Sequence, residues 1–129
     1  MSGIAGCLHC TGEPVDATLV RRMIQAIAHR GPDGEGYWSG GPVGLGHCLL
    51  HTTPESLEEV QPFSSEDGGL GIVCEARIDN RTELATSLAA HGVTLRTTTD
   101  AELILKAYER WDTACPQHLL GDFAFAIWD

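Results

Sequence analysis

Basic side chains are scarce in this sequence. Its 129 residues include 8 Lys and Arg against 18 Asp and Glu, and Lys106 is the single lysine, so the formal net charge is −10. A chain of this charge offers no basic patch to phosphate backbones or to anionic lipid head groups. We therefore expect no nucleic acid and no membrane as a partner. The acidic residues are scattered along the chain, which is typical of a solvated surface.

Long apolar runs are also missing. None approaches the ~20 residues that a membrane span requires, and the first residues lack the basic segment that opens a secretory signal. The five cysteines are an odd number, and without a secretory signal they are expected to be reduced thiols. Together these features predict a cytoplasmic protein.

A set of metal ligands is missing as well. Cys7 and Cys10 stand at a spacing found in zinc sites, but no second pair of Cys or His follows at ligand spacing. In a strand these two side chains would point to opposite faces. The sequence therefore predicts no metal site.

What is present is the apolar patterning of one domain, 43% apolar in composition. Strands are expected at 1–6, 43–50, 70–76 and 121–129, and helices at 16–29, 80–92 and 99–111. A Gly-rich loop at 29–38 is expected to lead into a strand, followed by a hairpin turn at 39–42, and a long loop is expected at 51–69. Asp16 is expected to N-cap the first helix. Asn80 with Glu83, and Thr99 with Glu102, have the spacing of capping boxes. This order predicts an α+β fold of layered sheets and helices.

The opening residues, Met1-Ser2-Gly3-Ile4-Ala5-Gly6, predict a strand inserted into a sheet, with Ser2 held inside the protein. A small second residue usually permits removal of the initiator Met. The Ser2 hydroxyl would then lie beside a free α-amine, whose reference pKa of about 7.7–8.0 suits a general base. The alternative is a plain edge strand with an ordinary serine.

Several motifs in register resemble a known family. They are Gly3-Ile4-Ala5-Gly6, His29-Arg30-Gly31-Pro32-Asp33-Gly34, Gly44-Leu45-Gly46-His47, Gln61-Pro62, Thr99-Asp100-Ala101-Glu102 and Gly121-Asp122-Phe123-Ala124-Phe125-Ala126-Ile127-Trp128-Asp129. In order and spacing they resemble class II glutamine amidotransferase domains, and most closely the N-terminal domain of glutamine-hydrolysing asparagine synthetases. The resemblance spans residues 1–129, which we take as a single domain.

The resemblance implies an N-terminal-nucleophile hydrolase fold, with helices packed on stacked antiparallel sheets. In the family, a Cys after the initiator Met releases ammonia from glutamine, and a synthetase domain uses it with ATP and Mg²⁺. We expect no cofactor in this chain and an ATP-dependent synthetase domain or subunit as its partner, and a homo-oligomer is left open. The family's domain continues past the last motif, so the chain is expected to be a fragment or an unusually short version.

At the chemical positions the sequence departs from the family. Ser2 replaces the nucleophilic Cys. Leu49 stands where an Arg clamps the substrate α-carboxylate, and Glu75-Ala76-Arg77 replaces the Asn-Gly-Glu run that supplies the oxyanion hole and an amine contact. Asp100, which would hold the substrate α-amine, remains. The loop Arg30-Gly31-Pro32-Asp33 is expected to lie over the pocket.

These departures leave three hypotheses. The first is a degenerate domain that does not hydrolyse glutamine and serves an amide-forming synthetase. The run Glu75-Ala76-Arg77-Ile78-Asp79-Asn80-Arg81 favours it, because it resembles the non-glutaminase branch of β-lactam synthetases and lasso-peptide cyclases. The second is an active amidohydrolase with Ser2 as nucleophile, and the third is a stand-alone binding module.

Overall fold

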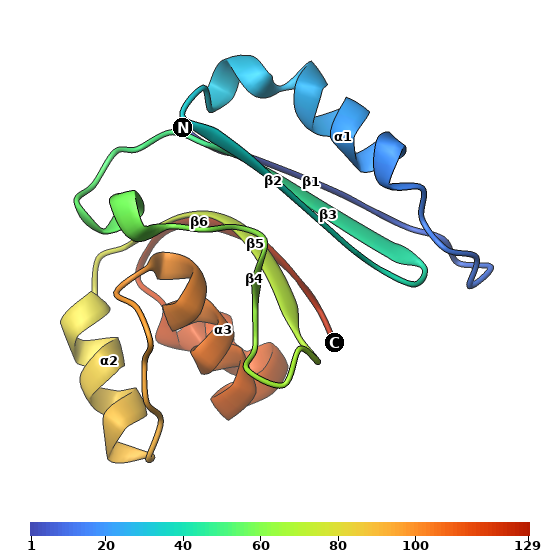
Figure 1. Ribbon diagram of the computed structural model, residues 1–129. Helices are drawn as coiled ribbons and strands as arrows, with labels where there is room; N and C mark the ends of the chain where they lie inside the picture. Colours follow the sequence, from blue (N-terminus) through green and yellow to red (C-terminus); the bar gives the residue numbers. More distant parts are fainter.

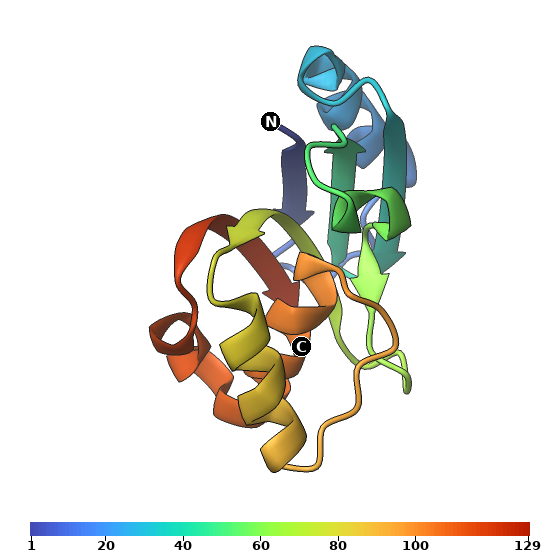
Figure 2. The ribbon, with the colours of Figure 1, turned by 90° about the vertical axis from the view of Figure 1, so that its left-hand side faces the viewer.

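The chain folds into four layers, which a computed structural model describes for all residues 1–129. Helix α1 covers one sheet, that sheet stacks on a second, and helices α2 and α3 cover the far side of the second sheet (Figures 1 and 2). The elements are β1 (Gly3–Leu8), α1 (Ala17–Ala26), η1 (Ala28–Arg30), β2 (Gly34–Gly40), β3 (Val43–Leu49), η2 (Glu55–Glu58), β4 (Phe63–Ser64), β5 (Gly71–Ile78), α2 (Arg81–Ala90), α3 (Asp100–Trp111), η3 (Asp112–His118) and β6 (Gly121–Trp128), where η marks a 3₁₀ helix.

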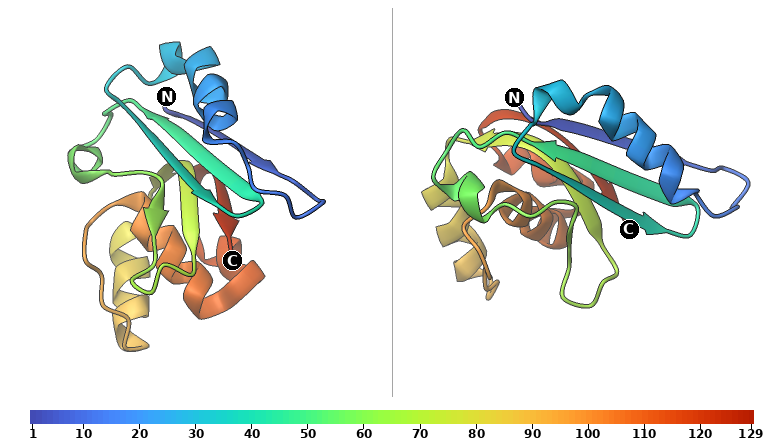
Figure 3. Two further views of the ribbon diagram at one scale, coloured as in Figure 1. Left: turned by 45° about the vertical axis from the view of Figure 1, so that its right-hand side comes forward. Right: turned by 45° about the horizontal axis from the view of Figure 1, so that its top comes forward.

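Both sheets have three strands and are antiparallel. The first has the order β1-β3-β2 and the second the order β4-β5-β6. Figure 3 shows the two sheets crossing face to face, with the N-terminal strand in the first and the C-terminal strand in the second. This arrangement confirms the α+β fold of stacked antiparallel sheets and helices expected from the sequence.

The central strand β3 shows why its sequence alternates small and large residues. An added Cβ at Gly44 or Gly46 would lie 2.4–2.5 Å from Val20 or Ile24 of α1, so both glycines let the helix approach closely. On the other face, Val43 and Leu45 pack with Val73 of β5 between the sheets.

The larger core lies between the second sheet and its helices. It contains 12 buried residues: Ile72, Cys74, Ile78, Leu84, Leu88, Ala101, Leu103, Ile104, Leu105, Ala107, Cys115 and Leu119. Helix α3 is buried along its first two turns because β5 and α2 both pack against it. It is the longest helix, at 12 residues, and no helix of the protein combines the length and apolar content needed to cross a membrane.

The helix starts agree with the sequence, but two of the expected caps differ. Asp16 accepts a hydrogen bond from the Thr18 amide as an N-cap should. Asn80 precedes α2 without capping it, because its side-chain amide donates to the His118 carbonyl and accepts from the Leu120 amide. The expected capping box at Asn80 is therefore wrong.

The Thr99–Glu102 box is half formed. Thr99 Oγ1 accepts from the Glu102 amide, whereas the Glu102 carboxylate accepts from the Arg96 and Thr97 amides, not from Thr99. The expected long loop also contains structure, namely η2 and the short edge strand β4. The first helix ends earlier than expected, at Ala26, and continues as the 3₁₀ turn η1.

Candidate functional site

Ser2 lies immediately before β1 and is 8% exposed. Strand β1 pairs with β3, which brings Ser2 beside the residues that leave the end of β3. The Ser2 hydroxyl accepts a hydrogen bond from the Leu50 amide at 3.0 Å, and its carbonyl accepts from Arg30 Nε at 3.4 Å. The expectation that residue 2 is held inside the protein is confirmed.

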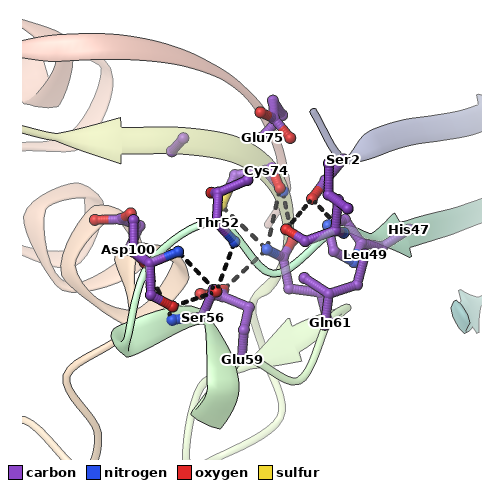
Figure 4. A pocket seen from close by; sticks show the side chains of 13 residues that line it. Ser2, His47, Leu49, Thr52, Ser56, Glu59, Gln61, Cys74, Glu75 and Asp100 are labelled. Carbon is purple, nitrogen blue, oxygen red and sulfur yellow. Dashed lines mark hydrogen bonds between the residues drawn. The ribbon is translucent and has the colours of Figure 1, made fainter. Parts of the chain in front are cut away.

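A small polar cavity of about 30 Å³ lies beside Ser2, between the two sheets (Figure 4). Its size admits one or two water molecules, whereas ligand pockets usually measure roughly 300–1,000 Å³. Its 13 lining residues are Ser2, His47, Leu49, Leu50, Thr52, Thr53, Ser56, Glu59, Gln61, Cys74, Glu75, Ala76 and Asp100. We call this space the Ser2 cavity.

The Ser2 cavity brings together most of the expected site residues. Ser2, Leu49, Glu75, Ala76 and Asp100 all line it, although they come from four separate segments of the chain. Figure 4 shows Ser2 and Asp100 on opposite sides of the cavity.

Arg77 lies elsewhere. It is exposed, forms ion pairs with Asp79 and Asp122, and lines a wider open groove of about 800 Å³. This groove shares Thr52, Thr53, Glu75 and Ala76 with the Ser2 cavity, so the cavity lies at its inner end.

The loop Arg30-Gly31-Pro32-Asp33 lies beside Ser2, and none of its residues lines the Ser2 cavity. Arg30 bonds to the Ser2 carbonyl, and Asp33 accepts from the His51 amide at 2.8 Å. An added Cβ at Gly31 would lie 2.4 Å from the Cys48 backbone, so this loop packs tightly on β3. The loop therefore supports the N-terminal strand, and the expected position over the pocket is not observed.

Asp100 already has a cationic partner. Arg81, at the start of α2, forms an ion pair with the Asp100 carboxylate at 2.5 Å and donates to the Thr98 carbonyl. Burial raises the pKa of Asp100, and the Arg81 guanidinium acts in the opposite direction. The charge of this buried carboxylate is thus balanced within the protein.

Glu59 and Gln61 form one wall of the cavity. The Gln61 amide donates to Glu59 at 2.9 Å and to the Cys74 carbonyl at 3.0 Å, and its oxygen accepts from the Cys74 amide. Gln61 thus pairs with β5 through its side chain. Burial raises the pKa of Glu59 to about 7, and the nearby Asp100 charge adds to this shift.

His47 is 2% exposed and also lines the cavity, and its Nε2 has no hydrogen-bond partner. Burial lowers the pKa of His47 to about 4, so the ring is neutral near pH 7. Sequence reasoning gave no role to Arg81, Glu59 or His47. Arg81 ends the run that begins at Glu75, and His47 ends the motif that begins at Gly44, but neither was given a role in the site. Glu59 lies in an irregular polar loop that has no motif.

The two stacked antiparallel sheets, covered by helices on their outer faces, form the fold of solved amidotransferase structures. Two solved structures have this fold over 99% of the chain, at 20% identity, with a TM-score of 0.77. One is the glutamine phosphoribosylpyrophosphate amidotransferase from B. subtilis complexed with ADP and GMP, and the other is described as the allosteric regulatory enzyme of purine biosynthesis. The chain covers 35% of each.

A family model described as a glutamine amidotransferase domain matches residues 1–129. The chain belongs to the class II glutamine amidotransferase family. Among curated relatives, asparagine synthetase (glutamine-hydrolyzing) 1 of Bacillus subtilis is 37% identical over 115 residues, 86% of the chain. Asparagine synthetase 2 of the same organism is 32% identical over 132 residues, and the amidase chry2 of Gibberella zeae is 33% identical over 108. The chain spans 16–17% of the length of these relatives.

Proposed function

We propose that the chain is the N-terminal amidotransferase-type domain of an asparagine-synthetase-like, ATP-dependent amide-forming enzyme, and that it does not hydrolyse glutamine. The similarity to asparagine synthetases supports the first part, because the matched region is 17% of those proteins and leaves room for a synthetase domain. ATP and Mg²⁺ would bind that partner, and the work of this domain would be to pack against it.

The main observation against glutamine hydrolysis is the charge of the residues that line the Ser2 cavity. Three of its 13 lining residues, Glu59, Glu75 and Asp100, are carboxylic acids, and none is Lys or Arg. Free glutamine has an α-carboxylate that needs a cation when it leaves water. Lack of a charged partner for a desolvated carboxylate typically costs about 2–5 kcal/mol, or a factor of about 30 to 5,000 in affinity. Arg81 is already paired with Asp100, and Arg30 donates to the Ser2 carbonyl without lining the cavity.

A residue of β5 also disfavours nucleophilic attack on an amide in this cavity. Glu75 lines the cavity and stands where the family resemblance places part of the oxyanion hole, so its carboxylate would repel a developing oxyanion. Loss of one oxyanion donor typically lowers a rate by about 10²–10³. The Ser2 hydroxyl is bonded only to the Leu50 backbone, so the base that remains for it is its own α-amine, which is free only after removal of Met1.

A reconstruction series tests the proposal. Ser2→Cys alone is expected to release no more ammonia from glutamine than Ser2→Ala, because the thiol would still face an acidic pocket. Adding Leu49→Arg, Glu75→Asn, Ala76→Gly and Arg77→Glu to Ser2→Cys is expected to raise ammonia release at least about tenfold, since it supplies a cation and an oxyanion donor. Glutamine hydrolysis by Ser2→Cys alone would contradict the proposal.

A further inference from the structure

A second pocket lies on the other side of the cavity wall. It has a volume of about 330 Å³ and shares four residues with the Ser2 cavity, namely His47, Leu49, Glu59 and Gln61. Its remaining lining comes from the start of β2 and from the segment around η2. We call it the β2-side pocket. Its volume lies within the range of small-ligand pockets, whereas that of the Ser2 cavity does not.

The β2-side pocket is acidic. Asp33, Glu35 and Glu59 line it, and no Lys or Arg does. Asp33 accepts from the His51 amide, Glu35 from the Tyr37 hydroxyl, and Glu59 from the Gln61 side chain and the Ala101 amide. A carboxylate has about four acceptor positions, so each of the three can accept further hydrogen bonds. An anionic ligand would be repelled, and an N–H donor with positive charge would be attracted.

His47 supplies an independent sign of a missing donor. Its Nε2 is buried and unpartnered, and leaving such an atom unpaired typically costs about 1–3 kcal/mol. The pKa of His47 is lowered to about 4 by burial, so the imidazole is neutral near pH 7 and Nε2 can accept a hydrogen bond in one tautomer. No group of this chain donates to it.

The rim of the pocket is apolar. Leu57 and Val60 both line it, yet they are 70% and 74% exposed, which is high for large apolar side chains. An alkyl chain that enters the pocket would cover them. Acceptors inside and apolar surface at the mouth match a head group that has only donors attached to a hydrocarbon stem.

We propose that the β2-side pocket binds an alkylammonium group, with the ammonium directed to His47 Nε2 and the Glu59 carboxylate and the alkyl stem against Leu57 and Val60. A free primary amine and a lysine side chain of a partner protein share this head group. The β2-side pocket shares a wall with the Ser2 cavity and does not include Ser2, so the proposal does not depend on whether the glutamine chemistry is lost.

The direct test is a titration of the full chain at pH 8 with n-butylammonium chloride, followed through the His47 ring resonances by NMR. We expect a saturable shift with a millimolar dissociation constant, and no saturable shift with 1-butanol, which has a similar shape and no charge. Equal effects of 1-butanol and n-butylammonium would overturn the proposal, because they would show binding without charge recognition.

Matched variants locate the ligand. Glu59→Gln is expected to weaken n-butylammonium binding at least about fivefold, whereas Glu75→Gln, which changes the Ser2 cavity and not the β2-side pocket, is expected to leave it unchanged. Val60→Lys places an ammonium at the exposed rim and is expected to abolish the shift. The reverse result, loss with Glu75→Gln and retention with Glu59→Gln, would overturn the assignment to this pocket.

A second titration with N-acetyl-Gly-Lys-Gly-amide shows whether the alkylammonium group belongs to a free amine or to a lysine side chain. Tighter binding of the peptide than of n-butylammonium would identify a lysine of a partner protein, and tighter binding of n-butylammonium would identify a free amine. Absence of a saturable shift with both probes would overturn the proposal.

Discussion

Single polar side chains near the Ser2 cavity form hydrogen bonds with backbone groups of other segments. Gln61 is 8% exposed, and its side-chain amide forms hydrogen bonds with both the amide and the carbonyl of Cys74 in β5. The side chain thus takes the place that the backbone of a neighbouring strand would have. Glu102 is fully buried and holds the Arg96 and Thr97 amides. Sequence reasoning treated both as motif or cap residues, because partners from distant segments leave no local pattern.

Replacement of Gln61 is expected to be costly. Gln61→Ala removes two hydrogen bonds to buried β5 backbone groups, and each unsatisfied group typically costs about 1–3 kcal/mol. We expect the free energy of unfolding to fall by about 2–4 kcal/mol in urea denaturation. Gln117→Ala, at an exposed position, is the control and is expected to change it by less than about 0.5 kcal/mol. Equal effects of the two variants would contradict this role.

Glu59 is expected to make stability depend on pH. Burial raises the pKa of Glu59 from its ordinary value of 4.5 to about 7 in the folded protein, so folding favours the protonated carboxyl. This contribution is complete below pH 4.5 and is lost as the pH rises through 7. Between pH 5 and pH 8 the free energy of unfolding of the wild type is therefore expected to fall more than that of Glu59→Gln. Parallel pH profiles of the two proteins would contradict the shift.

At the scale of elements, local signals predicted most boundaries. The Asp16 cap, the turn around Gly41 and the left-handed Gly92 after α2 are local features, and each lies where the sequence placed it. Strand β4 and the turn η2 were missed, because a two-residue edge strand depends on its pairing with β5 and has no periodicity of its own. Asn80 failed as a cap because the segment before β6 offers it better partners.

Strand β2 lies close to the loop at Gln61, so the two glycines Gly34 and Gly36 are expected to tolerate a larger side chain to different degrees. An added Cβ at Gly36 would lie 1.7 Å from the Gln61 carbonyl oxygen, whereas one at Gly34 has no neighbour closer than 3.9 Å. Gly36→Ala is expected to lower the free energy of unfolding by about 3 kcal/mol, because backbone must move. Gly34→Ala, on the same strand, is expected to lower it by at most about 1 kcal/mol. Similar melting temperatures for the two variants would contradict this packing.

At the scale of the whole molecule, the two layers of core differ in size. Twelve buried residues join β5 to α2, α3 and η3, whereas three join the two sheets. Regions with more buried apolar surface open less often. We expect the amides of Leu103, Ile104 and Leu105 to exchange only on global unfolding, and those of edge strand β2 to exchange faster. Hydrogen exchange followed by NMR measures this, and equal protection of β2 and α3 would contradict it.

The site was predictable in part. The motifs placed Ser2, Leu49, Glu75, Ala76 and Asp100 around one cavity, because the resemblance extends through the whole chain. The Arg81–Asp100 pair and the raised pKa of Glu59 were not predictable, since they depend on how α2, α3 and an irregular loop meet. Arg77 was expected in the pocket, but it lies near the end of β5 in the open groove, where it is exposed and forms ion pairs with Asp79 and Asp122.

The most direct test of the central claim is ammonia release from glutamine by the wild-type chain. The intact mass of the purified protein is determined first, so that the state of Met1 is known. We expect release no greater than that of Ser2→Ala, even when Met1 has been removed, because three carboxylic acids and no Lys or Arg line the cavity. Ammonia release by the wild type that is clearly above the Ser2→Ala background would contradict the account and make Ser2 an active nucleophile.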